Sequence, residues 1–317
     1  MKKNIDFKNK KILVAGGSGL LGSNITKLLI NANATFESSF NSKRFINKKY
    51  YKKFDFLKFK DCLKATKKKD IVFIVAVKGS GILNLEKNFF EQNLKNLTIR
   101  INLLEACRVN KVKNIVWVSS STVYQPLNKP IKEKEINLNI EPYKIYLGVG
   151  SAYRYLENIF MYYLKKFNMN IKIIRTTSIY GPFDNFDLNT SHVIPALIKK
   201  ALSKKKYLNV LGDPNVIRDF VFAEDLARAC ILLSLNKFKG IINFSSGRPT
   251  TIRQLSKKIV EIIKIKKKIK FVNKSKSSAK YRVLDNSKFD KLLKNFKRKK
   301  LKDGLFQTIQ WYLNNEK

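Results

Sequence analysis

The motif with the clearest chemical meaning is a glycine-rich turn near the N-terminus. The apolar run Lys11–Ala15 leads into Gly-Gly-Ser-Gly-Leu-Leu-Gly at residues 16–22, and a helical pattern continues over Leu20–Asn31. Glycines in such a turn let the backbone approach a pyrophosphate and let the helix pack closely on the strand, while the helix N-terminus faces the phosphates. The motif therefore predicts a dinucleotide-binding loop. Its binding residues are Gly16, Gly19, Leu20, Leu21 and Gly22.

The second predicted strand, Phe36–Phe40, should end beside the ribose of that dinucleotide. An acid at its tip would bind the 2′-hydroxyl of NAD, but Glu37 lies too early in the strand. The basic residues Lys43 and Arg44 follow instead, and they can pair with a 2′-phosphate. The sequence therefore favours NADP as the cofactor, with NAD possible.

The elements that position these residues alternate along the chain. Mainly apolar, strand-like runs occur at Lys11–Ala15, Ile71–Val77, Asn114–Ser119, Ile171–Arg175 and Ile241–Ser245. Helical patterns lie at Leu20–Asn31, Phe89–Asn110, Ser151–Phe167 and Ala223–Leu235. This alternation predicts a Rossmann-type α/β fold, in which a doubly wound parallel sheet is covered by helices on both faces.

Two stretches break the alternation, at about 181–219 and near the C-terminus. We expect them to form a smaller, partly interleaved α/β domain that binds the substrate. The predicted dinucleotide-binding domain comprises residues 1–178 plus about 220–246. The predicted substrate-binding domain comprises about 179–219 plus 247–317.

The net charge of +42 over 317 residues allows two interpretations. One is a nucleic-acid or anionic-membrane partner. The other is an accumulation of lysine at permissive surface positions. The lysines run along the whole chain rather than forming one basic arm, which favours the second interpretation. We expect no specific nucleic-acid partner and no membrane partner. The positive field would still attract a substrate that carries a diphosphate.

The apolar run Ile12–Ala15 is too short for a signal-peptide core or a membrane span, so we expect a cytoplasmic protein. Cys62, Cys107 and Cys230 lie far apart and form no CxxC pair. Buried free thiols in a reducing compartment are the simplest interpretation. We expect no metal site.

Several further motifs resemble the extended short-chain dehydrogenase/reductases, and among them the GDP-L-fucose synthase family. The longest is Tyr-Gly-Pro-Phe-Asp-Asn-Phe at 180–186, which continues into Ser-His-Val-Ile-Pro-Ala-Leu at 191–197. Other matches are Lys78–Ile82, Gln92-Asn93, Asn102–Ala106 and Arg218–Leu226. The resemblance covers nearly the whole chain. It implies a nicotinamide-dependent epimerase or reductase that acts on a nucleotide-linked sugar, specifically a GDP-linked 4-keto-6-deoxy sugar. It also implies a homodimer, because related enzymes pair two helices from each subunit.

The resemblance assigns roles to individual residues. Ser120 aligns with the family's catalytic serine, and Tyr143, after Glu141-Pro142, aligns with the tyrosine that exchanges a proton with the sugar oxygen. His192 aligns with the acid that protonates the sugar carbon. The resemblance also implies a substrate-binding site formed by Asn185, His192, Arg218 and Arg282. Asp55 matches the acid that contacts the adenine, although a solvated loop acid is an equally good interpretation.

The chain departs from the family where a lysine should follow the tyrosine by four residues. Counting from Tyr143 gives Leu147 at the lysine position. Counting back from Glu157 gives a second register, with Val149 at the tyrosine position and Tyr153 at the lysine position of the motif. Gly148 and Gly150 further suggest a helix that starts late or is distorted. In addition, Thr122 stands in place of a cysteine used in epimerisation, and threonine cannot act as a thiolate at neutral pH.

These departures leave alternatives to the main hypothesis. One is another nucleotide-sugar epimerase or dehydratase with altered acid/base residues. Another is a catalytically silent homologue that binds cofactor and nucleotide-sugar. The absent lysine supports the silent homologue, whereas the retained His192 and Arg218 argue against it.

Overall fold

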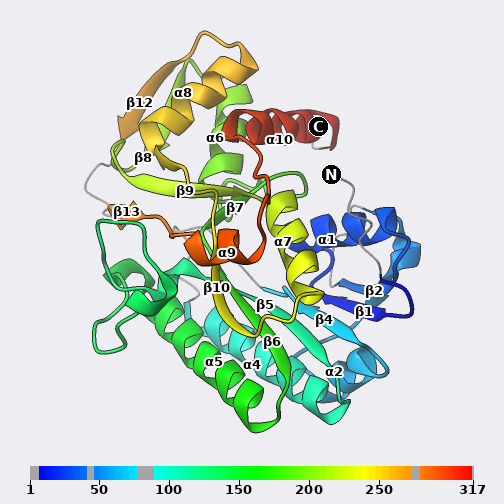
Figure 1. Ribbon diagram of the computed structural model, residues 1–317. Coiled ribbons are helices and arrows are strands. Elements are labelled where there is room, and N and C mark those ends of the chain that lie inside the picture. The colour runs from blue at the N-terminus through cyan, green and yellow to red at the C-terminus, as the bar shows by residue number, and fades with distance from the viewer. Residues whose placement is uncertain (1–6, 41–45, 78–88, 273–278, 316–317) are drawn as a thin grey trace.

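Seven parallel strands form the central sheet of the protein, seen here in a computed structural model that describes residues 7–40, 46–77, 89–272 and 279–315 (Figure 1). Their order is β10-β6-β5-β4-β1-β2-β3. The strands are β1 Lys11–Ala15, β2 Thr35–Phe40, β3 Tyr51–Lys53, β4 Ile71–Ile74, β5 Asn114–Ser120, β6 Asn170–Thr176 and β10 Gly240–Phe244. All registers between them are parallel.

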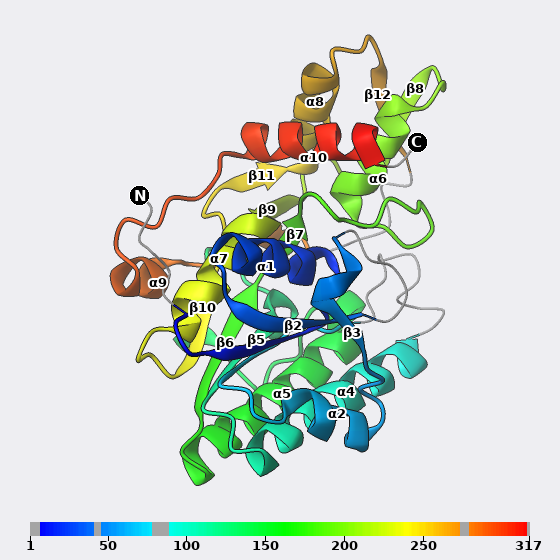
Figure 2. The same ribbon diagram turned by 90° about the vertical axis from the view of Figure 1, so that its right-hand side faces the viewer.

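Helices cover both faces of this sheet (Figure 2). One face carries α1 Leu20–Asn31 and α7 Ala223–Ser234, and the other carries α2 Phe59–Thr66, α4 Phe89–Val109 and α5 Leu147–Lys166. The apolar side chains of β1 alternate between two buried clusters, with Ile12 and Val14 in one and Leu13 and Ala15 in the other. Burial on both faces explains why the strand sequences are continuously apolar. The short 3-10 turns are η1 Lys48–Tyr50, η2 Ser121–Val123, η3 Glu133–Glu135 and η4 Lys144–Tyr146.

A second group of elements lies beyond the carboxyl ends of the central strands. Its four-stranded sheet contains β7 Ser178–Tyr180, β9 Ile217–Phe222, β11 Pro249–Thr251 and β13 Tyr281–Arg282. A two-stranded sheet pairs β8 Tyr207–Leu211 with β12 Lys268–Val272. The helices of this group are α6 Val193–Leu202, α8 Ile252–Ile263 and α10 Leu301–Asn315, whereas α9 Ser287–Leu292 packs on β10 of the central sheet through Phe289 and Phe244. The strand that spans the predicted boundary near residue 219, β9, pairs only within the four-stranded sheet.

The Rossmann-type prediction is confirmed, and β1 and α1 begin and end at the predicted residues. The expectation of a late or distorted α5 is wrong. The helix begins at Leu147 and runs through both Gly148 and Gly150. A Cβ at Gly150 would lie 2.4 Å from the Thr122 carbonyl oxygen, so glycine permits α5 to pack directly on the end of β5. The glycine marks a close approach between elements rather than a weak helix.

From β1 the chain adds β2 and β3 toward one edge of the sheet, and from β4 it adds strands toward the other edge, so the strand order reverses between the neighbours β1 and β4. In doubly wound sheets, ligands bind in the crevice outside the carboxyl ends of the strands at such a point. Gly16 follows β1 here and has a φ of +96°, a conformation that strongly favours glycine. The topology therefore places the glycine-rich turn at the expected ligand crevice.

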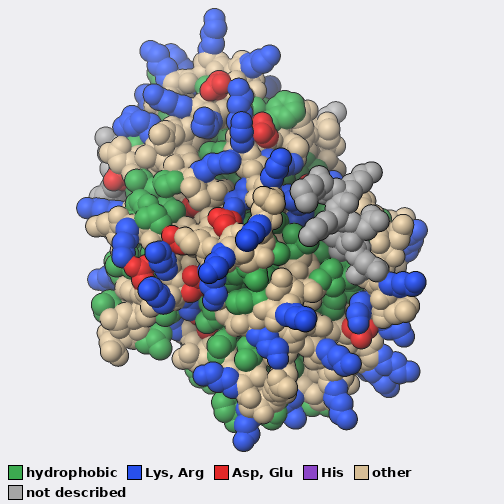
Figure 3. Space-filling view, viewed as in Figure 1, with side chains coloured by type: hydrophobic (Ala, Val, Ile, Leu, Met, Phe, Trp, Pro, Cys, Tyr) green, Lys and Arg blue, Asp and Glu red, His purple; other side chains and the backbone are tan. Residues whose placement is uncertain are grey.

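Basic side chains are spread over the whole face in Figure 3 rather than gathered over one element. None of the helices in the described ranges is both long and apolar enough to cross a membrane. The three cysteines are free and buried, as expected. Burial raises the pKa of the Cys62 thiol to about 12, so this thiol stays protonated at neutral pH.

Candidate active site

A single cavity of about 2090 Å³ extends from the glycine-rich turn to the small four-stranded sheet. Pockets for one small ligand typically measure roughly 300–1,000 Å³, so this cavity has room for two ligands side by side. The predicted site residues in its wall are Gly16, Gly19, Leu20, Leu21, Asp55, Ser120, Tyr143, Asn185, His192, Arg218 and Arg282. Gly22 lies beneath the turn and does not line the cavity.

The glycine-rich turn has the shape that a pyrophosphate requires. A Cβ at Gly22 would lie 2.0 Å from the Gly16 carbonyl oxygen, and one at Gly17 would lie 2.5 Å from the Ser38 Cβ. Helix α1 follows with no side-chain cap from Gly19, so its first N–H groups are open toward the cavity. A glycine cradle in front of an uncapped helix N-terminus fits the phosphates of a dinucleotide.

The residues that would contact the adenosine half are only partly described. Asp55 is exposed and lines the cavity, and its Oδ1 accepts a hydrogen bond of 3.2 Å from the Leu57 N–H. Glu37 on β2 is paired with Lys69 and Lys52. Lys43 and Arg44 lie outside the described residues, as does the Lys78–Ile82 motif, so their predicted contacts stay predictions.

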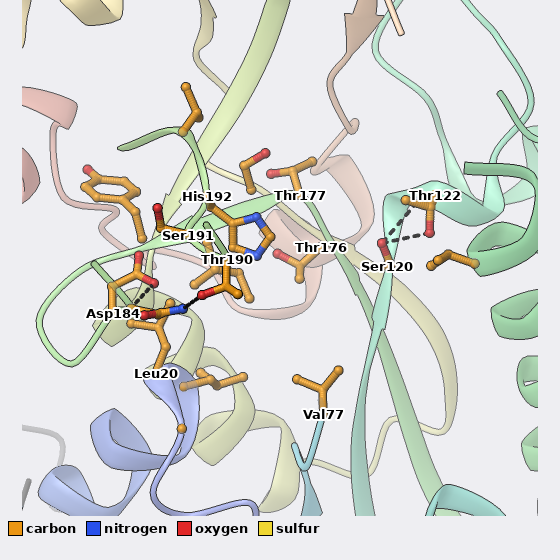
Figure 4. A pocket seen from close by; sticks show the side chains of 18 of the residues that line it. Leu20, Val77, Ser120, Thr122, Thr176, Thr177, Asp184, Thr190, Ser191 and His192 are labelled. Atoms are coloured by element: carbon orange, nitrogen blue, oxygen red, sulfur yellow. Dashed lines mark hydrogen bonds between the residues drawn. The ribbon is translucent and has the colours of Figure 1, made fainter. Parts of the chain in front are cut away.

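Ser120 is the last residue of β5 and presents its hydroxyl to the cavity (Figure 4). Its Oγ accepts hydrogen bonds from the Thr122 N–H at 3.2 Å and from the Thr122 hydroxyl at 3.0 Å. Because Ser120 accepts both bonds, its own proton remains available to a ligand oxygen. Thr122 therefore orients the serine in this structure.

Tyr143 precedes the short η4 turn and also lines the cavity. Its hydroxyl donates a hydrogen bond of 3.0 Å to the Tyr281 carbonyl oxygen on β13. Burial raises the pKa of Tyr143 above its ordinary value. Tyr143 therefore holds its proton tightly and directs it at the backbone of the small sheet.

The two sequence registers differ in where the structure places them. Leu147, the lysine position of the first register, is 37% exposed and lies outside the cavity wall. Val149 and Tyr153 of the second register both line the cavity. At the lysine position of the second register, the α5 side chain that lines the cavity is therefore the phenol of Tyr153.

The Tyr153 hydroxyl accepts a hydrogen bond of 2.7 Å from the Arg100 guanidinium on α4. Arg100 lies over the Tyr153 ring, with its Cζ 4.9 Å from the ring centroid. The ring also stacks on Trp117 of β5, at 5.9 Å between centroids. Arg100 was missed by sequence reasoning, because an arginine within a helical pattern in a chain this basic has no distinguishing signal.

His192 occupies the N-cap position of α6, but its side chain makes no capping hydrogen bond and lines the cavity. Figure 4 shows its imidazole beside the Thr176 and Thr177 side chains. Thr176 lies opposite Ser120 in the β5–β6 register, which brings histidine and serine to the same region. His192 is exposed to the cavity, and partial desolvation by the surrounding wall, followed by the charge of Arg282, lowers the pKa of its imidazole.

A group of buried polar atoms around His192 has no hydrogen-bond partner within the described part of the chain. The atoms are Thr176 Oγ1, Thr177 Oγ1, Ser191 Oγ and Asp184 Oδ2. Unpaired polar groups are costly to bury, so a ligand that hydrogen-bonds here would recover that cost. Burial also raises the pKa of Asp184 to about 7, which makes this carboxyl partly neutral near neutral pH.

The far end of the cavity holds two arginines without a carboxylate partner among the described residues. Arg218 is buried and donates to the Ile217 and Ala279 carbonyl oxygens, and Arg282 donates to the Ser178 hydroxyl at 3.1 Å. Burial, together with repulsion from Arg282, lowers the pKa of Arg218 to about 10. Two adjacent cations in a cavity wall can bind a diphosphate.

Tyr146 lies between these arginines and was also missed. The Arg282 Cζ is 4.9 Å from the centroid of the Tyr146 ring. Burial raises the pKa of Tyr146, but Arg282 and Arg218 outweigh it through charge and hydrogen bonding, so the pKa falls below its ordinary value. The sequence does not single out Tyr146, because no lysine follows it by four residues and because the two arginines come from strands that are distant in the chain.

Asn185 is exposed at the edge of the cavity. Its side-chain amide donates a hydrogen bond of 2.7 Å to the Thr190 hydroxyl and accepts one of 3.1 Å from the Asp187 N–H. In this structure Asn185 therefore organises the loop that leads to His192.

Comparison with known proteins agrees with this geometry. The model of the NAD dependent epimerase/dehydratase family matches residues 12–243. GDP-L-fucose synthase 1 of Arabidopsis thaliana is 27% identical over 318 residues, covering 97% of this chain and 94% of the relative. The GDP-L-fucose synthase of Escherichia coli K12 is 26% identical and covers 80% of this chain and 83% of the relative.

Solved structures agree as well. A UDP-N-acetylglucosamine 4-epimerase from Methanobrevibacter ruminantium in complex with UDP-N-acetylmuramic acid is 25% identical, with a TM-score of 0.84 over 96% of this chain and 98% of that one. A GDP-L-fucose synthetase from Naegleria fowleri bound to NADP is 22% identical, with a TM-score of 0.80 over 97% and 93%. With the family model matching nearly three quarters of its length, the chain belongs to the NAD dependent epimerase/dehydratase family.

Proposed function

We propose that this protein is an NADP-dependent reductase and epimerase of a nucleotide-linked sugar, and that its substrate is a GDP-linked 4-keto-6-deoxy sugar. The observation that carries the proposal is the shared cavity. It has a phosphate cradle at Gly16–Gly22, an arginine pair at Arg218 and Arg282, and hydroxyl and imidazole groups between them. The curated relatives that are GDP-L-fucose synthases favour the GDP-linked sugar.

The residues at each end would hold one ligand. Gly16, Gly19 and the N-terminus of α1 would bind the dinucleotide phosphates, and Lys43 and Arg44 would pair with the 2′-phosphate. Bound in its reduced form, the nicotinamide supplies a hydride. Arg218 and Arg282 would bind the diphosphate of the sugar nucleotide, and Asn185 would contact the sugar from the edge of the cavity.

Between these ligands, the protein's task is proton exchange. Ser120 would donate a hydrogen bond to the sugar's C4 oxygen, where negative charge develops during reduction. Tyr143, the tyrosine of the first register, would protonate the C4 oxygen only after its hydroxyl leaves the Tyr281 carbonyl oxygen. His192 would exchange a proton at the sugar carbon, since a neutral imidazole can accept one and then return it. With Thr122 in place of a thiol, reduction should be the stronger of the two activities.

A silent binding homologue is the second candidate, and Leu147 and Val149 favour it, because neither register supplies a tyrosine with a lysine four residues later. Both candidates retain cofactor and nucleotide binding. They differ only in turnover.

We further propose a cytoplasmic homodimer that pairs through α4 and α5. These neighbouring helices carry exposed apolar side chains at Leu94, Val109, Tyr155 and Tyr162. An apolar surface of this kind on two packed helices suits a two-fold contact. Light scattering at micromolar concentration should give twice the chain mass of 36.8 kDa, and a monomer would contradict the assembly.

The function is tested by incubating the protein with NADPH and a panel of nucleotide-linked 4-keto sugars. Products are identified by mass spectrometry and NMR. We expect NADPH consumption with the GDP-linked 4-keto-6-deoxy sugar. Tight binding of both ligands without any product would support the silent homologue instead.

A further inference from the structure

The cavity contains a phenol and a cation in contact, although not at the residues that the family motif specifies. Tyr153 projects into the cavity from α5, and Arg100 projects from α4. They meet at 2.7 Å between the Arg100 Nη2 and the Tyr153 Oη. The contact thus pairs a tyrosine of α5 with a cation of α4, whereas the family motif takes both its tyrosine and its lysine from a single helix.

Arg100 is only 2% exposed, and no carboxylate of the described residues forms an ion pair with it. Its Nη1 donates to the Asn96 carbonyl oxygen at 2.8 Å, and its Nε has no partner in the described part of the chain. A buried charge without a counter-ion is expensive. Its retention in the cavity wall suggests that negative charge appears beside it when the site works.

The direction of the hydrogen bond determines what Tyr153 can do. The guanidinium can only donate, so the Tyr153 oxygen accepts. The phenol's own proton is then left to donate, and none of the described residues accepts it. The ring stacks on Trp117, the middle residue of β5, the strand that ends at Ser120.

From this geometry we propose that Tyr153 is the proton donor of the site and that Arg100 is the cation that stabilises its phenolate. This rests on the proposed function. As hydride adds to the sugar's carbonyl carbon, the carbonyl π pair moves to oxygen, the Tyr153 O–H bond breaks, and its proton forms the new hydroxyl. The phenolate that remains is held by Arg100 and regains a proton from water. Ser120 hydrogen-bonds the same oxygen.

Three other tyrosines line the wall and compete for this role, of which Tyr180 donates its proton to the Leu301 carbonyl oxygen at 3.5 Å. Tyr143 already donates its proton to the Tyr281 carbonyl oxygen. Tyr146 sits between Arg218 and Arg282, where a bound diphosphate would compete for both cations. Of the four, Tyr153 combines a proton that no described residue accepts with a cation that lies outside the proposed diphosphate site.

The electrostatic part is tested without cofactor or substrate. In protein labelled with 13C at the tyrosine Cζ, the Tyr153 resonance is assigned by its loss in Tyr153→Phe. Arg100→Met should move this resonance, because the hydrogen bond to the phenol oxygen is lost, and Arg100→Lys should restore most of that change. An unchanged Tyr153 resonance in Arg100→Met would overturn the proposal.

Turnover tests the catalytic part, with NADPH oxidation measured for each variant. Tyr153→Phe and Arg100→Met should each lower kcat on the order of 100-fold, the usual worth of a positioned acid, with KM for the sugar nucleotide nearly unchanged. Arg100→Lys should recover most of the rate. Tyr207→Phe, on β8 and outside the cavity wall, is the matched control and should behave as the native protein.

The outcomes separate this proposal from the proposed function. If Tyr143→Phe or Tyr146→Phe abolishes turnover while Tyr153→Phe does not, Tyr153 is not the donor and the sugar-reductase function stands. If the native protein turns over no substrate, the proposed function fails, and the Tyr153 resonance in Arg100→Met still decides whether Arg100 holds the phenol oxygen.

Discussion

Glu157 on α5 and Arg175 on β6 form an ion pair of 2.6 Å, and both side chains are only 3% exposed. The Ser119 hydroxyl also donates to the Glu157 carboxylate, at 2.6 Å. These contacts fix the rotation of α5 against β5 and β6. Tyr153 and Val149 lie one and two helical turns before Glu157 and so share its face. The ion pair therefore explains why Val149 and Tyr153, rather than Leu147, are the α5 side chains that line the cavity.

Glu157→Gln should destabilise the fold strongly, because it leaves the Arg175 charge buried without a partner. We expect a loss of about 3–5 kcal/mol in the free energy of unfolding, measured by urea denaturation. The matched control is Glu105→Gln, which breaks the more exposed ion pair with Arg108 on α4 and should cost less than about 1 kcal/mol. Equal losses in the two variants would show that the buried pair does not fix α5.

Local patterns were sufficient to predict the sheet and the dinucleotide loop. Residues 11–31 carry a buried strand, a glycine turn and a helix within one continuous segment, so nothing distant is needed to recognise them. The catalytic region differs, because Arg100, Tyr153 and Arg282 come from three elements far apart in sequence. The glycines of α5 misled because a glycine weakens an isolated helix, while Gly150 serves the contact with Thr122, which only the tertiary structure shows.

The glycine turn gives a test with an internal control. A Cβ at Gly19 would meet the Gly16 carbonyl oxygen at 3.5 Å, an ordinary contact, whereas one at Gly22 would meet it at 2.0 Å. Gly19→Ala should leave the thermal midpoint unchanged but weaken dinucleotide binding by at least tenfold, because the methyl group occupies the phosphate side. Gly22→Ala should lower both. Native-like NADPH affinity in Gly19→Ala, measured by fluorescence titration, would place the phosphates elsewhere.

NADPH should bind at least tenfold more tightly than NADH, a difference of about 1.4 kcal/mol. The reason is that Glu37 is held by lysines and that two basic residues follow β2. The Lys43→Ala, Arg44→Ala double variant should remove the preference, and Lys48→Ala on the nearby η1 should keep it. Calorimetric titration with both cofactors checks this, and tighter binding of NADH by the native protein would refute it.

Asp184 should make the fold less stable as pH rises. Its folded-state pKa of about 7 lies above that of the unfolded chain, so the folded protein binds the extra proton between these values. Its contribution to stability is complete below about pH 4 and is lost as pH rises through 7. Relative to Asp184→Asn, the native protein should lose roughly 3 kcal/mol between pH 5 and pH 8 in urea denaturation. A pH-independent difference would mean that Asp184 is ionised when buried.

The central claim, that this cavity brings a reduced nicotinamide to the carbonyl of a nucleotide-linked sugar, is tested most directly by isotope transfer. The protein is incubated with NADPH deuterated at the transferable C4 position and with a GDP-linked 4-keto-6-deoxy sugar. The product is examined by mass spectrometry and NMR. We predict a reduced product with one deuterium at the former carbonyl carbon and one NADPH consumed for each product formed. Recovery of unreduced sugar alone, from a protein shown to bind both ligands, would contradict the account.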